Sequence, residues 1–338
     1  MSSFPLATQT AYQDLLESHK VRAVPNLGGA LISKSQGTQG NYWYARQRIG
    51  SRVVDRYVGR DTPEIRERIE KAKHELEDQK TFERRCSGLV AQLRAAGLLT
   101  LDRNTGKVLN AMARVGTFRL GGTLIGTHAF RLYGAELGVR LNDDIADTTQ
   151  DVGIEAFESI KIAIGYEVDS VLADALKYLK LFPVLNQSCK HKPTRWTMPG
   201  GRIMIDFLAP KISEDCDILM LEPLGIYAQA LPFLNFLISE PIPAVALYRS
   251  GVLVQIPRPE RYAVHKLIVA QCRIGDSRAK SRKDFAQARN LIRILSEDRP
   301  HALREAYETA LDGGPKWQAV IEKSLLQHPD IAEIIESL

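Results

Sequence analysis

Cysteines and long apolar stretches are scarce in this chain, and their scarcity argues against two classes of protein. The four cysteines, Cys86, Cys189, Cys216 and Cys272, lie far apart and form no CxxC pair or cysteine–histidine pattern. A zinc site is therefore not expected, and reduced thiols in the cytoplasm fit best. No apolar run approaches the roughly 20 residues that cross a bilayer, and residues 1–20 read as a polar amphipathic helix without signal-peptide features. We therefore expect a cytoplasmic protein without a membrane partner.

The chain also has only a small excess of positive charge. The 338 residues carry a formal net charge of +5, with 44% hydrophobic and 25% charged residues, which is ordinary for a globular protein of two or three domains. Basic residues concentrate in residues 46–60, 190–195 and 273–283. These stretches are either solvated faces or surfaces for phosphate or nucleic acid, and both interpretations stay open.

Residues 1–60 are predicted to form a small N-terminal module rich in β-structure. Glycines and serines punctuate short strands in residues 27–41, and residues 42–58 read as a β-hairpin that turns at Gly50 and Ser51. Aromatic residues interleave with arginines in this hairpin, an arrangement that can stack on bases and contact phosphates. The same residues can equally pack as an ordinary hairpin.

Residues 61–115 are predicted to form a helical linker domain. Thr62 and Pro63 are suited to the N-cap and the first position of a helix, and a second helix is expected at about residues 82–96. A turn at residues 104–106 gives residues 98–109 some likeness to the wing of a winged helix-turn-helix, although a helical linker explains the region better.

Residues 116–258 mix strand and helix signals, whereas residues 259–338 are predicted to be helical. The mixed region begins with a strand, a glycine-containing turn and a helix over residues 119–138. The other elements expected are a strand at 149–154, a helix at 168–179, a hairpin around 199–201 leading into a strand at 202–208, a hairpin at 244–256, and helices at 262–273, 282–295, 303–311 and 317–325.

Three places in the mixed region carry the residue types that phosphoryl transfer needs. The reaction requires cations that spread the charge of the triphosphate and donors that hold it in line. Gly126 and Thr127 open a predicted helix, where exposed N–H groups favour phosphate. Asp151 lies on a predicted strand, and Asp206 lies in the middle of an apolar strand. A carboxylate there is costly to bury unless it faces a cleft, a metal or a cation.

These motifs resemble the bacterial nucleotidyltransferases of the polymerase-beta-type superfamily, near its abortive-infection and tRNA-modifying toxin enzymes. The family pattern is a Gly-Ser or Gly-Thr turn that opens a helix, an Asp-x-Asp strand and a third Asp on a later strand. The matching segments are residues 124–130, 149–153 and 205–210, and the likeness continues through residues 259–267 and 283–288.

The resemblance covers roughly residues 85–297 and implies an α/β (α+β) fold. The expected domains are a β-rich module at 1–60, a helical linker at 61–115, a nucleotidyltransferase core with a mixed sheet flanked by helices at 116–258, and a helical domain at 259–338.

The resemblance also implies roles for the residues of the core motifs. Asp151 and Asp206 would hold Mg²⁺ or Mn²⁺, and Gly126, Thr127 and His128 would cradle the phosphates. A histidine at this place can alternatively cap the helix or face solvent.

The C-terminal helices would complete the site. The resemblance implies that Lys266 and Lys283 bind the nucleotide and that Asp284 orients or deprotonates the acceptor hydroxyl. Lys266 can alternatively pack its stem on the core, and Asp284 can pair with Lys283, Lys280 or an arginine.

One departure from the family pattern is Gly153, which stands where the second metal-binding aspartate belongs. Alternate residues of a strand point the same way, so Glu155 shares the face of Asp151, about 6–7 Å further along. Glu155 is therefore a candidate third metal ligand; otherwise Asp151 and Asp206 hold the metal alone.

Two functions follow. In the first, the chain is a Mg-dependent enzyme that transfers a nucleoside monophosphate from an NTP to an RNA 3′ end (tRNA among the candidates) or to a protein hydroxyl. In the second, the loss of the aspartate at Gly153 leaves a nucleotide- or nucleic-acid-binding protein with impaired catalysis. A toxin–antitoxin role is suggested by the resemblance, and a homo-oligomer is compatible with the sequence.

Overall fold

The computed structural model describes residues 2–21, 30–35, 41–49, 52–114, 116–141, 159–165, 181–184, 192–198, 203–212, 217–222, 226–272 and 278–338. Asp151, Gly153 and Glu155 lie outside these residues. The predicted strand at 149–154, the predicted helix at 168–179 and the tips of the predicted hairpins at 50–51 and 199–201 also lie outside them.

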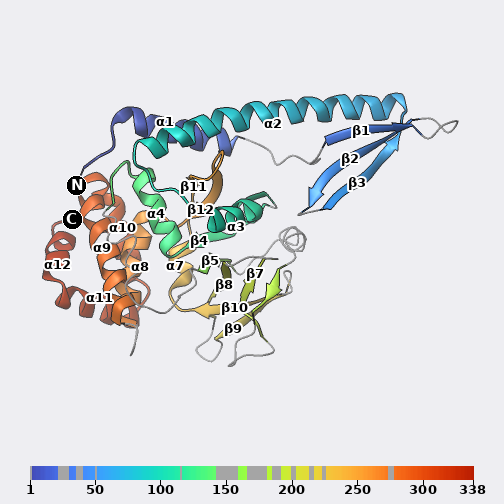
Figure 1. The fold of residues 1–338 in the computed structure, drawn as a ribbon. Coiled ribbons are helices and arrows are strands. Elements are labelled where there is room, and N and C mark those ends of the chain that lie inside the picture. Colours follow the sequence, from blue (N-terminus) through green and yellow to red (C-terminus); the bar gives the residue numbers. More distant parts are fainter. Residues whose placement is uncertain are drawn as a thin grey trace.

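A mixed sheet forms the centre of the molecule (Figure 1). Its order is β4 (Thr123–Ile125), β5 (Ser159–Ala163), β8 (Met204–Pro210), β10 (Ile226–Leu231) and β9 (Ile218–Leu221). Strands β5, β8 and β10 run parallel, whereas β4 and β9 are antiparallel to their neighbours. Two short strands extend it, β7 (Arg195–Thr197) on β8 and β6 (Phe182–Pro183) on β7. The sheet confirms the predicted α/β class.

Helices enclose the β4 side of this sheet. The strand β4 leads directly into α4 (Thr127–Glu136), and α7 (Leu234–Ile238) follows β10. The C-terminal helices gather beside α4: α8 (Pro259–Cys272), α9 (Arg278–Asp298), α10 (Pro300–Leu311), α11 (Pro315–Gln327) and α12 (Pro329–Glu336). The predicted helices of this region are confirmed by α8 to α11, and α12 lies in the part predicted to be helical without bounds of its own.

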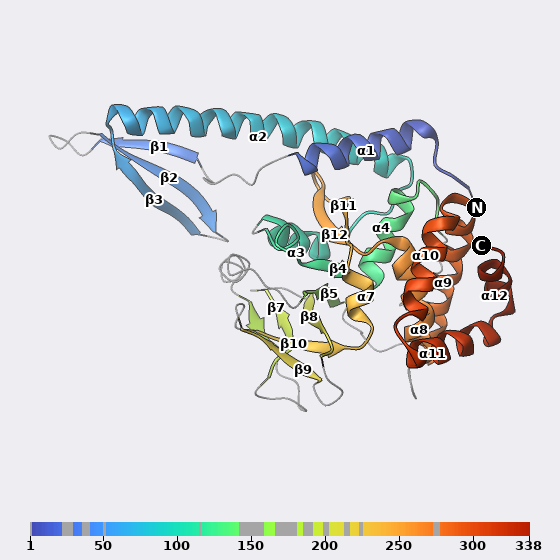
Figure 2. The same cartoon turned by 180° about the vertical axis from the view of Figure 1, so that it is seen from behind.

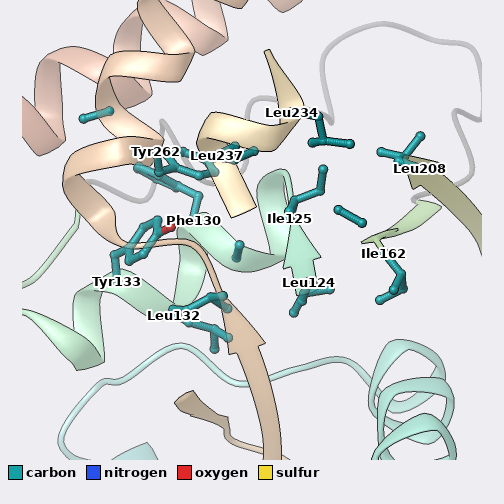
Figure 3. Close-up of a cluster of buried hydrophobic side chains, with 14 of the residues drawn as sticks. Leu124, Ile125, Phe130, Leu132, Tyr133, Ile162, Leu208, Leu234, Leu237 and Tyr262 are labelled. Carbon is teal, nitrogen blue, oxygen red and sulfur yellow. The ribbon is translucent and has the colours of Figure 1, made fainter. Parts of the chain in front are cut away.

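One hydrophobic core joins the sheet to these helices (Figure 3). Leu124 of β4 and Phe130 of α4 are fully buried in it. The ring of Tyr262 from α8 stacks on Phe130 and meets Tyr133 edge-on, with centroids 6.2 and 5.2 Å apart. These aromatic contacts fix α8 against the start of α4.

A second core holds the N-terminal helices. It joins α1 (Leu6–Lys20) to α2 (Pro63–Ala95) and to the hairpin of β11 (Ile242–Ala246) and β12 (Val252–Ile256). Tyr12, Cys86 and Leu93 are almost fully buried there. The Tyr12 hydroxyl accepts a hydrogen bond from the Val245 amide at 3.2 Å. The predicted hairpin at 244–256 and the predicted N-terminal helix are confirmed.

Helix α2 corrects the prediction of two helices between residues 63 and 96. It is continuous over 33 residues, because residues 64–87 contain neither glycine nor proline to break it. Its predicted start is confirmed: the Thr62 hydroxyl caps it by accepting a hydrogen bond from the Ile65 amide at 3.3 Å, and Pro63 is its first residue.

The wing suggested for residues 98–109 is wrong, because this region forms α3 (Arg103–Arg114). Asp102 Oδ1 accepts hydrogen bonds from the amides of Asn104 at 2.8 Å and Thr105 at 3.1 Å, which is the geometry of a helix N-cap. Gly106 is required for close packing and not for a turn, since a Cβ there would overlap the ring of Tyr248.

The cap at Asp102 makes a first prediction. Burial alone raises the pKa of this carboxyl, but hydrogen bonds from Thr105 and Asn104 and the nearby His128 outweigh it, so the pKa is lowered. Asp102→Ala is expected to lower the free energy of unfolding by about 1 kcal/mol at neutral pH. Asp102→Asn is expected to lower it by less, because asparagine also caps helices.

The pKa of Asp102 is lower in the folded chain than in the unfolded chain. The stabilisation by its carboxylate is therefore complete at pH values above the unfolded pKa, and it is lost as the pH falls through the folded pKa. Urea titrations at about pH 7 and about pH 3 measure this. Equal stabilities of Asp102→Ala and wild type at neutral pH would contradict the cap.

A separate three-stranded antiparallel sheet stands at the far end of α2 (Figure 2). It consists of β1 (Ala30–Ser35), β2 (Asn41–Ile49) and β3 (Arg52–Arg60), in that order. The pair β2–β3 confirms the predicted hairpin.

Across the described part of the chain, no helix has both the length and the apolar character that a membrane crossing requires.

Candidate functional site

The turn from β4 into α4 has the backbone geometry of a phosphate-binding turn. Gly126 has φ 73° and ψ −151°, a region that only glycine occupies without strain. Thr127, the next residue, begins α4. The first N–H groups of a helix have no partner within it and carry partial positive charge. The turn therefore presents donors at the edge of the sheet, where an anion can bind.

The substitution Gly126→Ala is predicted to damage this turn in two ways. The left-handed backbone should cost about 1–3 kcal/mol of stability with a side chain present, and the changed turn should lower the affinity for NTP. Gly314, the N-cap of α11 at φ 103°, provides the control, because a Cβ added there would have no atom within 4 Å.

Gly314→Ala should lose a similar amount of stability and keep the NTP affinity, measured by calorimetric titration. Unchanged NTP affinity in Gly126→Ala would contradict a role of the turn in binding.

A row of registered residues crosses the sheet directly beside this turn. Ile125 of β4 pairs with Lys161 of β5, Lys161 pairs with Asp206 of β8, and Asp206 pairs with Arg195 of β7. Directly opposed residues of neighbouring strands share one face of a sheet. Asp206 therefore lies about 10 Å from Ile125, two strand spacings away, on the same face.

Asp206 carries an ion pair in this row. Its Oδ1 and Oδ2 accept hydrogen bonds from Arg195 Nε at 2.7 Å and Nη2 at 3.3 Å. The Asp206 side chain is 13% exposed and that of Arg195 is 51% exposed. The hydrogen bond to Asp206 raises the pKa of Arg195. The cation expected beside a mid-strand aspartate is therefore Arg195.

Lys161 brings a second cation to the turn. A Cβ placed on Gly126 would lie 3.5 Å from Lys161 Cδ, so the lysine stem passes alongside the glycine. Lys161 was not predicted for the site, and Arg195 was noted only as part of the basic stretch at residues 190–195. The available signal was the one used for Asp206, a charged residue within a short apolar strand, and for Arg195 also its place in a basic stretch.

The helices α8 and α9 add a buried charge pair behind the turn. Lys266 Nζ lies 2.5 Å from Asp284 Oδ1, with side chains 11% and 5% exposed. Lys266 Nζ lies 5.2 Å from the centroid of the Tyr262 ring. The Tyr262 hydroxyl lies 3.1 Å from the Gly126 carbonyl oxygen and 3.0 Å from Gln287 Oε1. One tyrosine ring thus separates the charge pair from the turn.

Two other residues predicted for the site, His128 and Lys283, are also described by the structure. His128 is 3% exposed and close enough to Asp102 for its charge to lower the pKa of that residue, so its ring lies toward the start of α3. Lys283 is partly buried on α9. Searched over the described ranges, the structure contains no group of three or more His, Cys, Asp or Glu side chains placed to hold a metal.

The structure thus brings together Gly126, Thr127, Asp206, Lys266 and Asp284, the last two through Tyr262. Gly126 and Thr127 form the turn from β4 into α4, Asp206 lies on β8, and Lys266 and Asp284 lie on the packed helices α8 and α9. The assembly offers N–H groups that can bind an anion, together with cations and two carboxylates.

Two family models match the chain. A family model described as nucleotidyltransferase matches residues 103–312, more than half of the chain. A second model, described as a domain of unknown function (DUF6788), matches residues 20–67. No curated protein and no solved structure matches the chain significantly.

Proposed function

Because the chain belongs to this nucleotidyltransferase family, we propose that it transfers a nucleoside monophosphate from an NTP to a hydroxyl acceptor. In this reaction the acceptor oxygen forms a bond to the α-phosphorus, the bond to the β-phosphate bridging oxygen breaks, pyrophosphate leaves, and the hydroxyl proton passes to a base or to water. The observation that carries the proposal is the sheet row that sets Asp206 two strands from the Gly126 turn.

Each group of the site has a task in this proposal. The N–H groups that follow Gly126 hold phosphate oxygens, and Lys161 beside the turn adds a positive charge. Lys266 contributes a further point charge toward the triphosphate. Asp284 is 5% exposed and bound to Lys266, which supports a role in holding the ammonium group in place.

Asp206 fits the metal that the family implies. Mg²⁺ keeps several waters and binds through one or two carboxylates together with phosphates, and Asp206 supplies such a carboxylate. Asp151, with Glu155 as a candidate third ligand, is proposed to complete the set. When bound, Mg²⁺ or Mn²⁺ spreads the negative charge of the triphosphate. Arg195 shares the Asp206 carboxylate and competes with a metal for it.

We propose an RNA 3′ hydroxyl, tRNA included, as the acceptor in preference to a protein hydroxyl. The basic stretches at residues 46–60, 190–195 and 273–283 support this choice. The motif resemblance supports a cytoplasmic enzyme of the kind found among abortive-infection and toxin nucleotidyltransferases.

A label-transfer assay tests the proposed function. The purified chain is incubated with each α-labelled NTP, Mg²⁺ or Mn²⁺, and total RNA or total protein, and transferred label and released pyrophosphate are measured together. Transfer by the wild-type chain, lost in Asp206→Asn, supports the proposal. Absence of transfer with every NTP, metal and acceptor contradicts it.

A second function is favoured by two observations. Gly153 stands at the position of the second metal-binding aspartate, and Asp206 is already paired with Arg195. Under this alternative the chain binds NTP without releasing pyrophosphate. Gly153→Asp distinguishes the two, since it should raise transfer if a metal ligand was lost and should change little if Glu155 replaces that ligand.

A further inference from the structure

The sheet of β1, β2 and β3, here called the arm sheet, is held away from the nucleotide site by α2 (Figure 2). The 33 residues of α2 extend about 50 Å. Its C-terminal half is anchored by the second core, through residues such as Cys86 and Leu93. The arm sheet lies at its N-terminal end and coincides with the domain of unknown function.

Asp61 links the arm sheet to the start of α2. Asp61 accepts hydrogen bonds from Arg66 Nε and Nη2, both at 2.9 Å, and from Trp43 Nε1 at 3.0 Å. The hydrogen bond from Arg66, followed by the one from Trp43, lowers the pKa of Asp61 to about 2. The face of β2 that carries Trp43 is therefore turned toward the helix junction.

The formal net positive charge of the chain can be accounted for by the residues of the arm sheet. Residues 30–60 contain six basic residues and one acidic residue, an excess of five that equals the formal net charge of all 338 residues. The rest of the chain is therefore formally neutral. The basic residues are Lys34, Arg46, Arg48, Arg52, Arg56 and Arg60, and the acidic one is Asp55.

Two tyrosines of β2 and a lysine of β1 share the second face of the arm sheet. Alternation along β2 places Tyr42 and Tyr44 on the face opposite to that of Trp43. Tyr42 and Tyr44 are partly exposed. Lys34 pairs with Tyr42 in register, and its Nζ lies 4.9 Å from the centroid of the Tyr44 ring.

We propose that this face of the arm sheet binds single-stranded nucleic acid. Aromatic rings stack on bases of any sequence, and flanking cations follow the phosphates. An acidic protein surface would engage the charges alone, whereas a single strand also presents flat bases on which tyrosine rings can stack. This binding site is separate from the transferase site and does not depend on the proposed transfer.

Fluorescence anisotropy with the full chain tests the proposal without NTP or divalent metal. The probes are a labelled RNA and a labelled DNA of the same sequence, each about 12 nucleotides long, and the matching duplex. Tyr44→Leu should weaken single-strand binding about tenfold or more, whereas Tyr44→Phe, which keeps the ring, should stay within about twofold of wild type.

A charge variant keeps the test valid if Tyr44→Leu disturbs the arm sheet. Arg46→Ser with Arg48→Ser should flatten the slope of log K against log salt by about 1.4, roughly 0.7 for each lost phosphate contact. Arg304→Ser, which removes an exposed arginine on α10, is the matched control and should keep the wild-type slope.

Tighter binding of either single strand than of the duplex, reduced by the arm variants alone, supports the proposal, and the RNA and DNA probes show which sugar is preferred. Three results overturn it: no binding of either single strand, preference for the duplex, or equal losses in Arg304→Ser and the arm variants.

Discussion

Replacing Asp206 with asparagine is expected to lower nucleotide transfer at least about a hundredfold. Changing a group that merely supports a metal ligand typically costs 10–100-fold, and removing the negative charge of a ligand should cost at least as much. In this variant Lys161 and Arg195 still lie opposite residue 206 on the neighbouring strands, and Arg195 then faces a neutral amide. The rate of label transfer at saturating NTP and Mg²⁺ measures the effect.

Asp217→Asn is the matched control for this substitution. Asp217 also forms an ion pair, with Lys211 at 2.8 Å, but its side chain is 85% exposed. An exposed pair of this kind contributes about 0–1 kcal/mol, so the variant should fold and transfer label like wild type. Full transfer by Asp206→Asn, or equal losses in both variants, would remove Asp206 from the reaction.

Replacing Lys266 with methionine is expected to cost about 3–5 kcal/mol of stability at neutral pH. The substitution leaves the Asp284 carboxylate, which is 5% exposed, without its partner in the interface of α8 and α9. Asp284→Leu should cost a comparable amount, because it leaves the ammonium group unpaired. Urea titration followed by circular dichroism measures both losses.

The double variant Lys266→Met with Asp284→Leu provides the control. Replacing both members of a buried pair by apolar residues is often close to neutral, so the double variant should recover most of the stability. The expected coupling is therefore large. Single losses below about 1 kcal/mol that add in the double variant would show that the pair is not buried together.

The local sequence pattern was sufficient to predict several of the helices that position the site. The glycine turn before residue 127 and the apolar periodicity of the C-terminal helices correspond to the start of α4 and to α8–α11. Gly106 shows where such reasoning fails. Its glycine indicated a turn, but it is explained by Tyr248, which lies 142 positions further along the chain.

The site itself depends on pairings that the sequence does not display. Asp206 was selected as a buried charge, yet its partner Arg195 and its neighbour Lys161 follow from the register of β5, β7 and β8. The choice of Lys266 as the partner of Asp284 follows from the packing of α8 on α9. Local charge patterns suggested Lys283 or Lys280 instead, because spacing along one helix cannot reveal contacts with another.

The claim that the Gly126 turn and Asp206 form one nucleotide site is tested most directly by a crystal structure with a non-hydrolysable NTP and Mg²⁺. We expect the triphosphate to bind to the N–H groups that follow Gly126, and we expect the metal to lie between the triphosphate and the Asp206 carboxylate. A triphosphate bound elsewhere, with Asp206 still held only by Arg195, would contradict it.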